Sequence, residues 1–222
     1  MSYRYRLAIF DLDGTVLDTL DDLADSVNAV LAANGYPTHT KQTVCSFVGN
    51  GIKKLIERAV PNGIAVAEVA RVLSAFEAYY ALHCADKTAP YEGISEMLAS
   101  LRAAGVKTAV LSNKADFATQ ALCHEYFPGV FDVVAGEREK EGIPKKPAPD
   151  ALFAIMKQCG ATAADTVYIG DSDVDILTAA NAGVDAILVS WGFRDEAFLR
   201  ERGAKTVVHT AKELKAMICA KN

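Results

Sequence analysis

The chain has 222 residues, of which 51% are hydrophobic and 23% charged, and its formal net charge is -5. This composition is ordinary for a globular protein with a large apolar core. The mixed acidic and basic residues argue against nucleic acid and anionic membranes as partners, and no apolar run reaches the length of a membrane span.

The first predicted element is a buried strand over 7–12. Leu7 to Phe10 form an apolar run, and Asp11, Asp13 and Gly14 end the strand because Asp and Gly are poor strand formers. Apolar residues then recur at helical spacing up to about residue 86, with breaks at 49–51 and 61–63. We therefore predict an all-helical insertion directly after the first strand.

From residue 90 onward, helical and strand patterns alternate. The predicted helices cover 94–104, 116–126, 150–159, 175–182, 196–202 and 212–219. The predicted strands cover 106–111, 131–135, 166–169, 186–189 and 206–208. Strands separated by helices imply right-handed crossovers and a mostly parallel sheet. The expected fold class is α/β, a Rossmann-like parallel sheet with helices on both faces, in which a discontinuous core of 1–15 and 88–222 carries an all-helical cap of 16–87.

The five cysteines are scattered along the chain and never spaced as Cys-x-x-Cys. This pattern predicts reduced thiols rather than disulfides or a sulfur-based metal site. The sequence begins without a signal-peptide pattern, so we expect a cytoplasmic protein.

Polar side chains follow four of the predicted strands. They are Asp11 and Asp13, then Ser112, Asn113 and Lys114, then Lys146, and finally Asp171 and Asp175. Because the carboxyl ends of parallel strands lie at one edge of the sheet, these residues can converge on one crevice. Asp11, Asp13 and Asp171 offer only oxygen ligands, which suit Mg²⁺.

This set of residues suits phosphoryl transfer. A carboxylate can attack phosphorus and form an aspartyl-phosphate, the role we assign to Asp11. Asp13 can protonate the leaving alkoxide and then deprotonate the attacking water. Lys146 and the Ser112 hydroxyl would bind phosphate oxygens, and backbone N–H groups after Asp11 would complete the cradle. We also predict phosphate binding at Gly14, Thr15 and Asn113.

Four segments in this order resemble the motifs of the haloacid dehalogenase superfamily: Asp11-x-Asp13-Gly14-Thr15, Ser112-Asn113-Lys114, Lys146-Pro147-Ala148-Pro149 and Gly170-Asp171-Ser172-x-x-Asp175. The resemblance implies a nucleophile at Asp11, an acid/base at Asp13, and Mg²⁺ held by the Asp11 and Asp171 side chains and the Asp13 backbone carbonyl. It also implies that Asp175 supports the metal's water shell or Lys146. The name-giving dehalogenases lack the second Asp, so Asp13 favours phosphoryl transfer.

Within this superfamily, Phe47-Val48-Gly49-Asn50-Gly51 and Trp191-Gly192-Phe193 resemble bacterial phosphoglycolate phosphatases. Gly49, Asn50 and Gly51 are open to two interpretations, a substrate-facing loop or a plain break between helices. Lys145 is a second candidate beside Lys146, which we prefer because it precedes Pro147. Lys114 and Arg194 are candidate entrance residues.

We therefore expect a Mg²⁺-dependent phosphomonoesterase whose cap closes over a small phosphorylated acid, with 2-phosphoglycolate as the leading substrate. The alternatives are a phosphatase for a phosphosugar, a nucleoside monophosphate or pyrophosphate, a phosphomutase, and a non-catalytic binding protein. We expect no nucleic-acid or membrane partner, and a monomer or homodimer.

Overall fold

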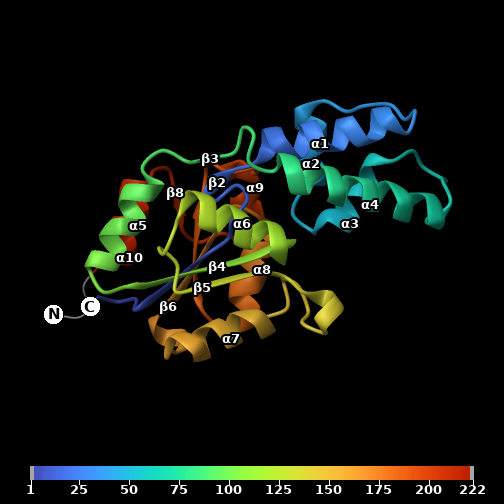
Figure 1. Cartoon of the computed structure of the whole chain (residues 1–222). Helices are drawn as coiled ribbons and strands as arrows, with labels where there is room; N and C mark the ends of the chain where they lie inside the picture. The colour runs from blue at the N-terminus through green and yellow to red at the C-terminus, as the bar shows by residue number, and fades with distance from the viewer. Residues whose placement is uncertain (1–2, 221–222) are drawn as a thin grey trace. The chain divides into compact units, whose positions relative to one another are not determined.

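The computed structural model describes residues 3–220, and the chain divides into two compact units (Figure 1). One unit contains the chain up to Leu17 and everything from Pro90 onward, and the other is Asp18–Ala89. The chain crosses between the units through β2 (Leu17–Asp18) and β3 (Ala89–Pro90), which pair with each other. The role of the second unit as a cap stays a prediction.

The larger unit is built on a six-stranded sheet in the order β5-β4-β1-β6-β7-β8, in which every pair is parallel. Its strands are β1 (Leu7–Phe10), β4 (Lys107–Ala115), β5 (Val133–Glu137), β6 (Thr166–Gly170), β7 (Asp185–Val189) and β8 (Val207–Val208). The chain builds outward from β1 to β5 on one side and then from β6 to β8 on the other. This reversal of strand order lies at β1, and ligands bind at the carboxyl ends of strands at such a point.

Helices cover both faces of this sheet, which confirms the predicted α/β class (Figure 1). They are α5 (Ile94–Ala103), α6 (Asp116–Tyr126), α7 (Asp150–Cys159), α8 (Asp173–Ala182), α9 (Glu196–Glu201) and α10 (Ala211–Ile218). Leu7 and Ile9 share one apolar cluster with residues of α7 and α8, while Ala8 and Phe10 between them are also fully buried. The strand β1 is therefore buried on both faces, which explains its unbroken apolar run.

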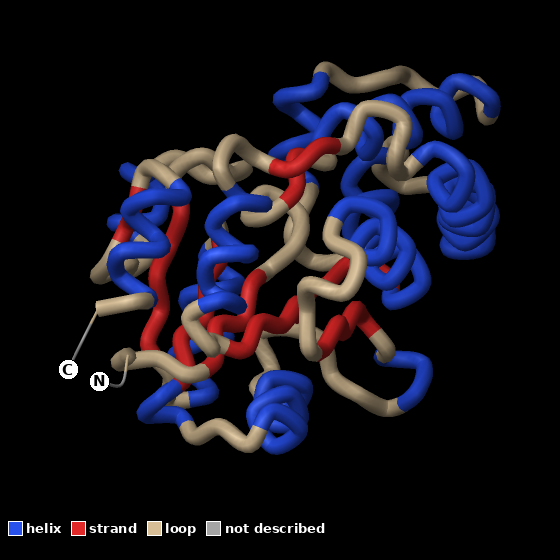
Figure 2. The backbone as a smooth tube through the Cα atoms, turned by 60° about the vertical axis from the view of Figure 1, so that its left-hand side comes forward, coloured by secondary structure: helices blue, strands red, loops and turns tan. Residues whose placement is uncertain are grey.

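The smaller unit contains four helices and no strand between the first and the last of them (Figure 2). They are α1 (Leu20–Ala33), α2 (Lys41–Phe47), α3 (Ile52–Ala59) and α4 (Val66–His83). Two of the three breaks between these helices fall at the predicted segments 49–51 and 61–63, and the third lies between Ala33 and Lys41. The buried carboxylate of Asp22 accepts hydrogen bonds from the backbone N–H groups of Lys87 and Thr88, which ties the returning chain to α1. No helix within residues 3–220 combines the length and apolarity that a membrane span requires.

Two predicted boundaries near the site are wrong. The strand β4 does not end at Leu111 but continues to Ala115, with a shift of its register against β5 between these two residues. Irregular pairing of this kind lets polar side chains sit within a strand beside a site. The helix α8 begins at Asp173 rather than Asp175, and its N-cap is Ser172, because Asp175 reaches back to accept hydrogen bonds from Ser172.

Candidate active site

Asp11 lies directly after β1, and its backbone N–H still donates to Ile169 of the neighbouring strand. Its Oδ1 accepts a hydrogen bond from the Leu12 N–H at 2.7 Å and contacts the Lys146 Nζ at 3.0 Å. Within residues 3–220 no hydrogen bond to its Oδ2 is found, so this oxygen is available to react. Burial raises the pKa of Asp11 to about 6, against the opposing effect of the Lys146 charge.

Lys146 is held in place by three groups around its buried ammonium. Its Nζ lies 3.0 Å from the Asp11 Oδ1, 2.8 Å from the Asp175 Oδ1 and 2.9 Å from the Tyr168 hydroxyl. Burial alone would lower the pKa of Lys146, but the two carboxylates outweigh it and hold that pKa well above its usual value. Lys146 is therefore a fixed positive charge beside Asp11.

The side chains of Asn113 and Lys145 make different contacts. The Asn113 side-chain amide donates to the Lys146 backbone carbonyl at 3.0 Å and accepts from the Lys146 N–H at 2.9 Å. The Asn113 amide therefore braces the Lys146 backbone, and phosphate binding by Asn113 stays a prediction. The Lys145 side chain is partly exposed and pairs with Glu139 at 2.9 Å, so the geometry favours Lys146 over Lys145.

Asp171 follows β6 and is enclosed by backbone on two sides. Its Oδ2 accepts a hydrogen bond from the Phe193 N–H at 2.6 Å. A Cβ atom at Gly14 or at Gly192 would collide with the Asp171 side chain, and Gly14 also has a φ of +79°. These positions therefore require glycine, because any larger residue would displace the carboxylate.

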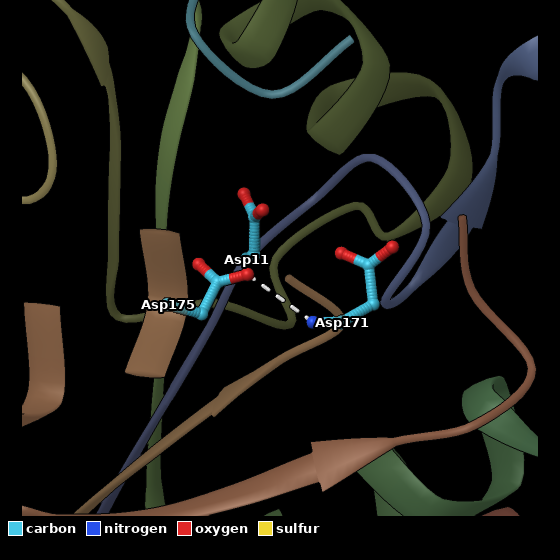
Figure 3. Close-up of side chains that lie close together, drawn as sticks. All are labelled: Asp11, Asp171 and Asp175. Carbon is cyan, nitrogen blue, oxygen red and sulfur yellow. Dashed lines mark hydrogen bonds between the residues drawn. The ribbon is translucent and has the colours of Figure 1, made fainter. Parts of the chain in front are cut away.

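Asp175 has both carboxylate oxygens fully engaged. Its Oδ1 accepts from Lys146 and from Tyr168. Its Oδ2 accepts from the N–H and hydroxyl of Ser172, and from the Asp171 N–H (Figure 3). Oxygen atoms of Asp11, Asp171 and Asp175 lie within 4.8 Å of one another. Because Asp175 is saturated with donors, we assign it to support of Lys146 and of the Asp171 backbone rather than to a metal.

Asp13 has a separate lysine partner. The Lys114 Nζ lies 3.0 Å from the Asp13 Oδ1 and 3.3 Å from its Oδ2. The Lys114 side chain is only 2% exposed, so the prediction that it lines an entrance is wrong. Its side chain is drawn inward because the carboxylate supplies the partner that a buried ammonium needs.

The backbone groups of Gly14 and Thr15 do not form the predicted cradle. The Gly14 N–H donates to the Leu17 carbonyl at 2.9 Å, and the Thr15 N–H donates to the Leu12 carbonyl at 3.3 Å. Buried N–H groups need acceptors, and the tight turn supplies them locally. Ser112 is buried, and its hydroxyl accepts from the Lys114 N–H at 3.3 Å.

Gly49, Asn50 and Gly51 belong to the smaller unit, between α2 and α3. The Asn50 side-chain carbonyl accepts a hydrogen bond from Arg58 at 2.8 Å, and Arg58 also donates to the Phe47 carbonyl at 2.7 Å. These bonds shape the loop from within its own unit. A substrate-facing role for it stays a prediction.

The charges of the centre do not balance. Asp11, Asp13, Asp171 and Asp175 bring four carboxylates, against the two ammonium groups of Lys114 and Lys146. Burial raises the pKa of Asp171 well above its usual value, and the nearby negative charges of Asp175 and Asp11 add to this. A buried oxygen-only cluster with an excess of negative charge fits a hard divalent cation.

The sequence that carries these side chains matches a known family. The family described as haloacid dehalogenase-like hydrolase matches residues 8–189. The chain belongs to this family. It is 34% identical over 217 residues to the phosphoglycolate phosphatase of Pseudomonas syringae pv. tomato. This match covers 94% of this chain and 78% of the relative. It is also 34% identical over 214 residues to that of Colwellia psychrerythraea, covering 93% of both chains.

Solved structures agree with this assignment. A crystal structure from Lactobacillus delbrueckii subsp. bulgaricus, named as a candidate phosphoglycolate phosphatase, superposes with a TM-score of 0.92 at 39% identity. The match covers 98% of this chain and 100% of that one. This haloacid dehalogenase-like hydrolase is therefore a phosphatase, and members of its family generally use Mg²⁺.

Three features of this hydrolase's site escaped the sequence-based predictions as site contributors. Tyr168 lies within the apolar strand β6, yet its hydroxyl touches Lys146. Gly192 and Phe193 lie beyond β7, yet they enclose Asp171. A polar atom in an otherwise apolar strand was a signal for Tyr168, and the Trp-Gly-Phe segment after a parallel strand was a signal for the other two.

Proposed function

We propose that this phosphatase is a Mg²⁺-dependent phosphomonoesterase that hydrolyses 2-phosphoglycolate through an aspartyl-phosphate on Asp11. The observation that carries the chemistry is the Asp11 carboxylate, whose Oδ1 is held by Lys146 and the Leu12 N–H while Oδ2 is left to react. The substrate rests on the resemblance to relatives named phosphoglycolate phosphatase.

The residues present suit a magnesium ion. The Asp11 and Asp171 side chains and the Asp13 backbone carbonyl would hold it, and the excess negative charge of the cluster would be offset. When bound, Mg²⁺ would neutralise phosphate charge and favour in-line attack. Asp175 would take no part as a ligand, because donors already occupy both its oxygens.

The reaction proceeds in two transfers. In the first, the Asp11 Oδ2 forms a bond to phosphorus, the ester P–O bond breaks, and the leaving alkoxide takes a proton from Asp13. In the second, Asp13 takes a proton from water, the water oxygen bonds to phosphorus, and the bond to Asp11 breaks. Inorganic phosphate leaves, and Asp13 is again protonated. The positive charge of Lys146, fixed beside Asp11, would stabilise the negative charge of the phosphoryl group in both transfers.

The helical unit would act as a cap that excludes water and then opens to release product. Its insertion directly after β2 supports this role, because the linkers then begin a few residues from Asp11 and Asp13. Gly49, Asn50 and Gly51 are the candidates for substrate contact within it. Specificity would then depend on the cap rather than on the carboxylates.

A phosphate-release panel tests the function. The purified chain is assayed with Mg²⁺ and 2-phosphoglycolate, a phosphosugar, a nucleoside monophosphate and pyrophosphate, and kcat/KM is determined for each. We expect 2-phosphoglycolate to exceed the others by about tenfold or more, the discrimination that a few specific contacts supply. A higher kcat/KM for another ester would overturn the substrate. Little net release, with activation by a sugar bisphosphate, would indicate a phosphomutase.

Metal removal gives a second expected result. We expect EDTA to abolish phosphate release and added Mg²⁺ to restore it, because a phosphate dianion can approach the buried carboxylates only when a cation offsets their charge. A thermal melt with and without Mg²⁺ serves as the independent readout, since a ligand that binds the folded state raises its stability. Full activity in EDTA, with an unchanged melting temperature, would contradict the metal site.

Asp13→Asn is expected to affect substrates unequally. The amide cannot donate a proton to an alkoxide, so kcat on 2-phosphoglycolate should fall by about 100-fold or more. The loss on p-nitrophenyl phosphate should be smaller, because nitrophenolate leaves without protonation. Equal losses on the two esters would remove the acid role from Asp13.

A further inference from the structure

We propose that Lys114 is a positioning residue that orients the Asp13 carboxyl group toward the leaving group. This inference rests on the proposed function, because it gives Asp13 the acid/base role. Lys146 and Lys114 then have parallel tasks. Lys146 holds one oxygen of the nucleophile, and Lys114 holds the proton donor two residues later.

The contact between Lys114 and Asp13 involves both carboxylate oxygens. The Nζ lies 3.0 Å from Oδ1 and 3.3 Å from Oδ2, so it faces the carboxylate from one side. A lysine ammonium has only donors and no acceptor. A proton on Asp13 cannot point at Lys114, since two N–H or O–H donors would then face each other. The proton would therefore lie on the side of the carboxyl group away from Lys114, and the proposal places the approach of the leaving group on that side.

Burial makes this orientation fixed. The Lys114 side chain is 2% exposed, whereas that of Asp13 is 14% exposed, so the lysine lies behind the acid as seen from solvent. A surface lysine on four rotatable bonds would hold nothing firmly, because ordering it costs side-chain entropy. At Lys114 that entropy is already lost in the folded chain.

The backbone at Lys114 is also held. Its N–H donates to the Ser112 hydroxyl at 3.3 Å, and its carbonyl accepts from the Thr119 hydroxyl at 3.3 Å. This segment lies within the stretch of β4 where the register against β5 shifts between Leu111 and Ala115. An irregular strand re-aims side chains, and here it delivers the ammonium to Asp13.

A double-mutant cycle tests the proposal. The wild type, Lys114→Met, Asp13→Asn and the double variant are assayed on 2-phosphoglycolate and on p-nitrophenyl phosphate. We expect Lys114→Met to lower kcat on 2-phosphoglycolate by about 10- to 100-fold, and by less than about threefold on p-nitrophenyl phosphate. In the Asp13→Asn background it should cost almost nothing further, because its partner's function is already lost.

Two controls accompany the cycle. Lys107→Met removes an ammonium from the other end of β4, where its Nζ donates to the Cys159 carbonyl at 2.9 Å, and should leave kcat unchanged on both esters. Lys114→Arg keeps the charge and the donors, and should retain more activity on 2-phosphoglycolate than Lys114→Met does. If Lys114→Met does not fold by circular dichroism, Lys114→Gln takes its place in the cycle.

Three results would overturn the role of Lys114: equal losses on both esters, the same loss in the Asp13→Asn background, or recovery of Lys114→Met at raised Mg²⁺. Each would indicate a general or metal-related defect. If the wild type released no phosphate from either ester, the proposed function itself would fall, and the role of Lys114 with it. An active wild type with any of the three results above would overturn only the inference about Lys114.

Discussion

Asp11→Asn is expected to abolish turnover, with kcat falling by about 10³-fold or more. An amide oxygen is a far weaker nucleophile than a carboxylate, and no other described carboxylate combines contact with Lys146 and an oxygen left to react. Asp13 is paired with Lys114, and Asp175 is saturated with donors. Phosphate release from 2-phosphoglycolate, followed over hours, is the measurement.

The fold of this variant is expected to survive. Burial raises the pKa of Asp11 to about 6, so burial disfavours the charge that the amide removes. Lys146 still keeps Asp175 and the Tyr168 hydroxyl as partners, so its ammonium is not left unpaired. The amide oxygen can still accept from the Leu12 N–H. Its melting temperature should match the wild type, and Asp150→Asn, at the exposed first residue of α7, provides a control with full activity. Retention of more than about one-hundredth of the wild-type kcat would remove the nucleophile role from Asp11.

Lys146→Met is expected to damage both activity and stability. Without its ammonium, Asp11 and Asp175 are left as buried like charges, and breaking a buried ion pair in this way costs about 3 to 5 kcal/mol. We expect kcat to fall by about 100-fold or more, because a fixed positive charge beside a transferring phosphoryl group contributes on that scale. Urea denaturation measures the loss of stability, and phosphate release measures the loss of activity.

Lys145→Met is the matched control, one residue away. Lys145 is partly exposed and pairs with Glu139 at the surface, so its loss should cost less than about 1 kcal/mol and leave kcat within about twofold of the wild type. The opposite ranking of the two variants would show that the lysine was assigned wrongly. Comparison of the two variants also separates the effect of the positive charge at Lys146 from the effect of the loop's overall positive charge.

Most of the fold could be predicted from apolar periodicity. The bounds of α6 and α7 agree with the predicted ones, because each has a regular apolar stripe and a polar start. The end of β4 could not be predicted. Ser112, Asn113 and Lys114 look like the end of a strand by composition, but hydrogen bonding to β5 resumes at Ala115 after a shift of register. That pairing depends on a neighbour more than 20 residues away in the chain.

The site could be predicted where a residue's role follows from its place at a strand end. Asp11, Lys146 and Asp171 are such residues, and the structure brings each to the centre around the end of β1. Asn113 could not be assigned in this way. Its side chain looks like a phosphate ligand by type, whereas its two hydrogen bonds to Lys146 exist only once β4 meets the loop that carries Lys146.

Motif spacing was enough to predict which acids and which lysine follow which strands, and the alternation of helices and strands was enough to predict a mostly parallel sheet. The pairing of the charges became visible only in the folded chain. Lys146 serves Asp11 and Asp175, Lys114 serves Asp13, and Gly192 makes room for Asp171. The physical reason is that periodicity and motif spacing are local properties of the chain. Ion pairing and close approach depend instead on distances between segments that the chain brings together only on folding.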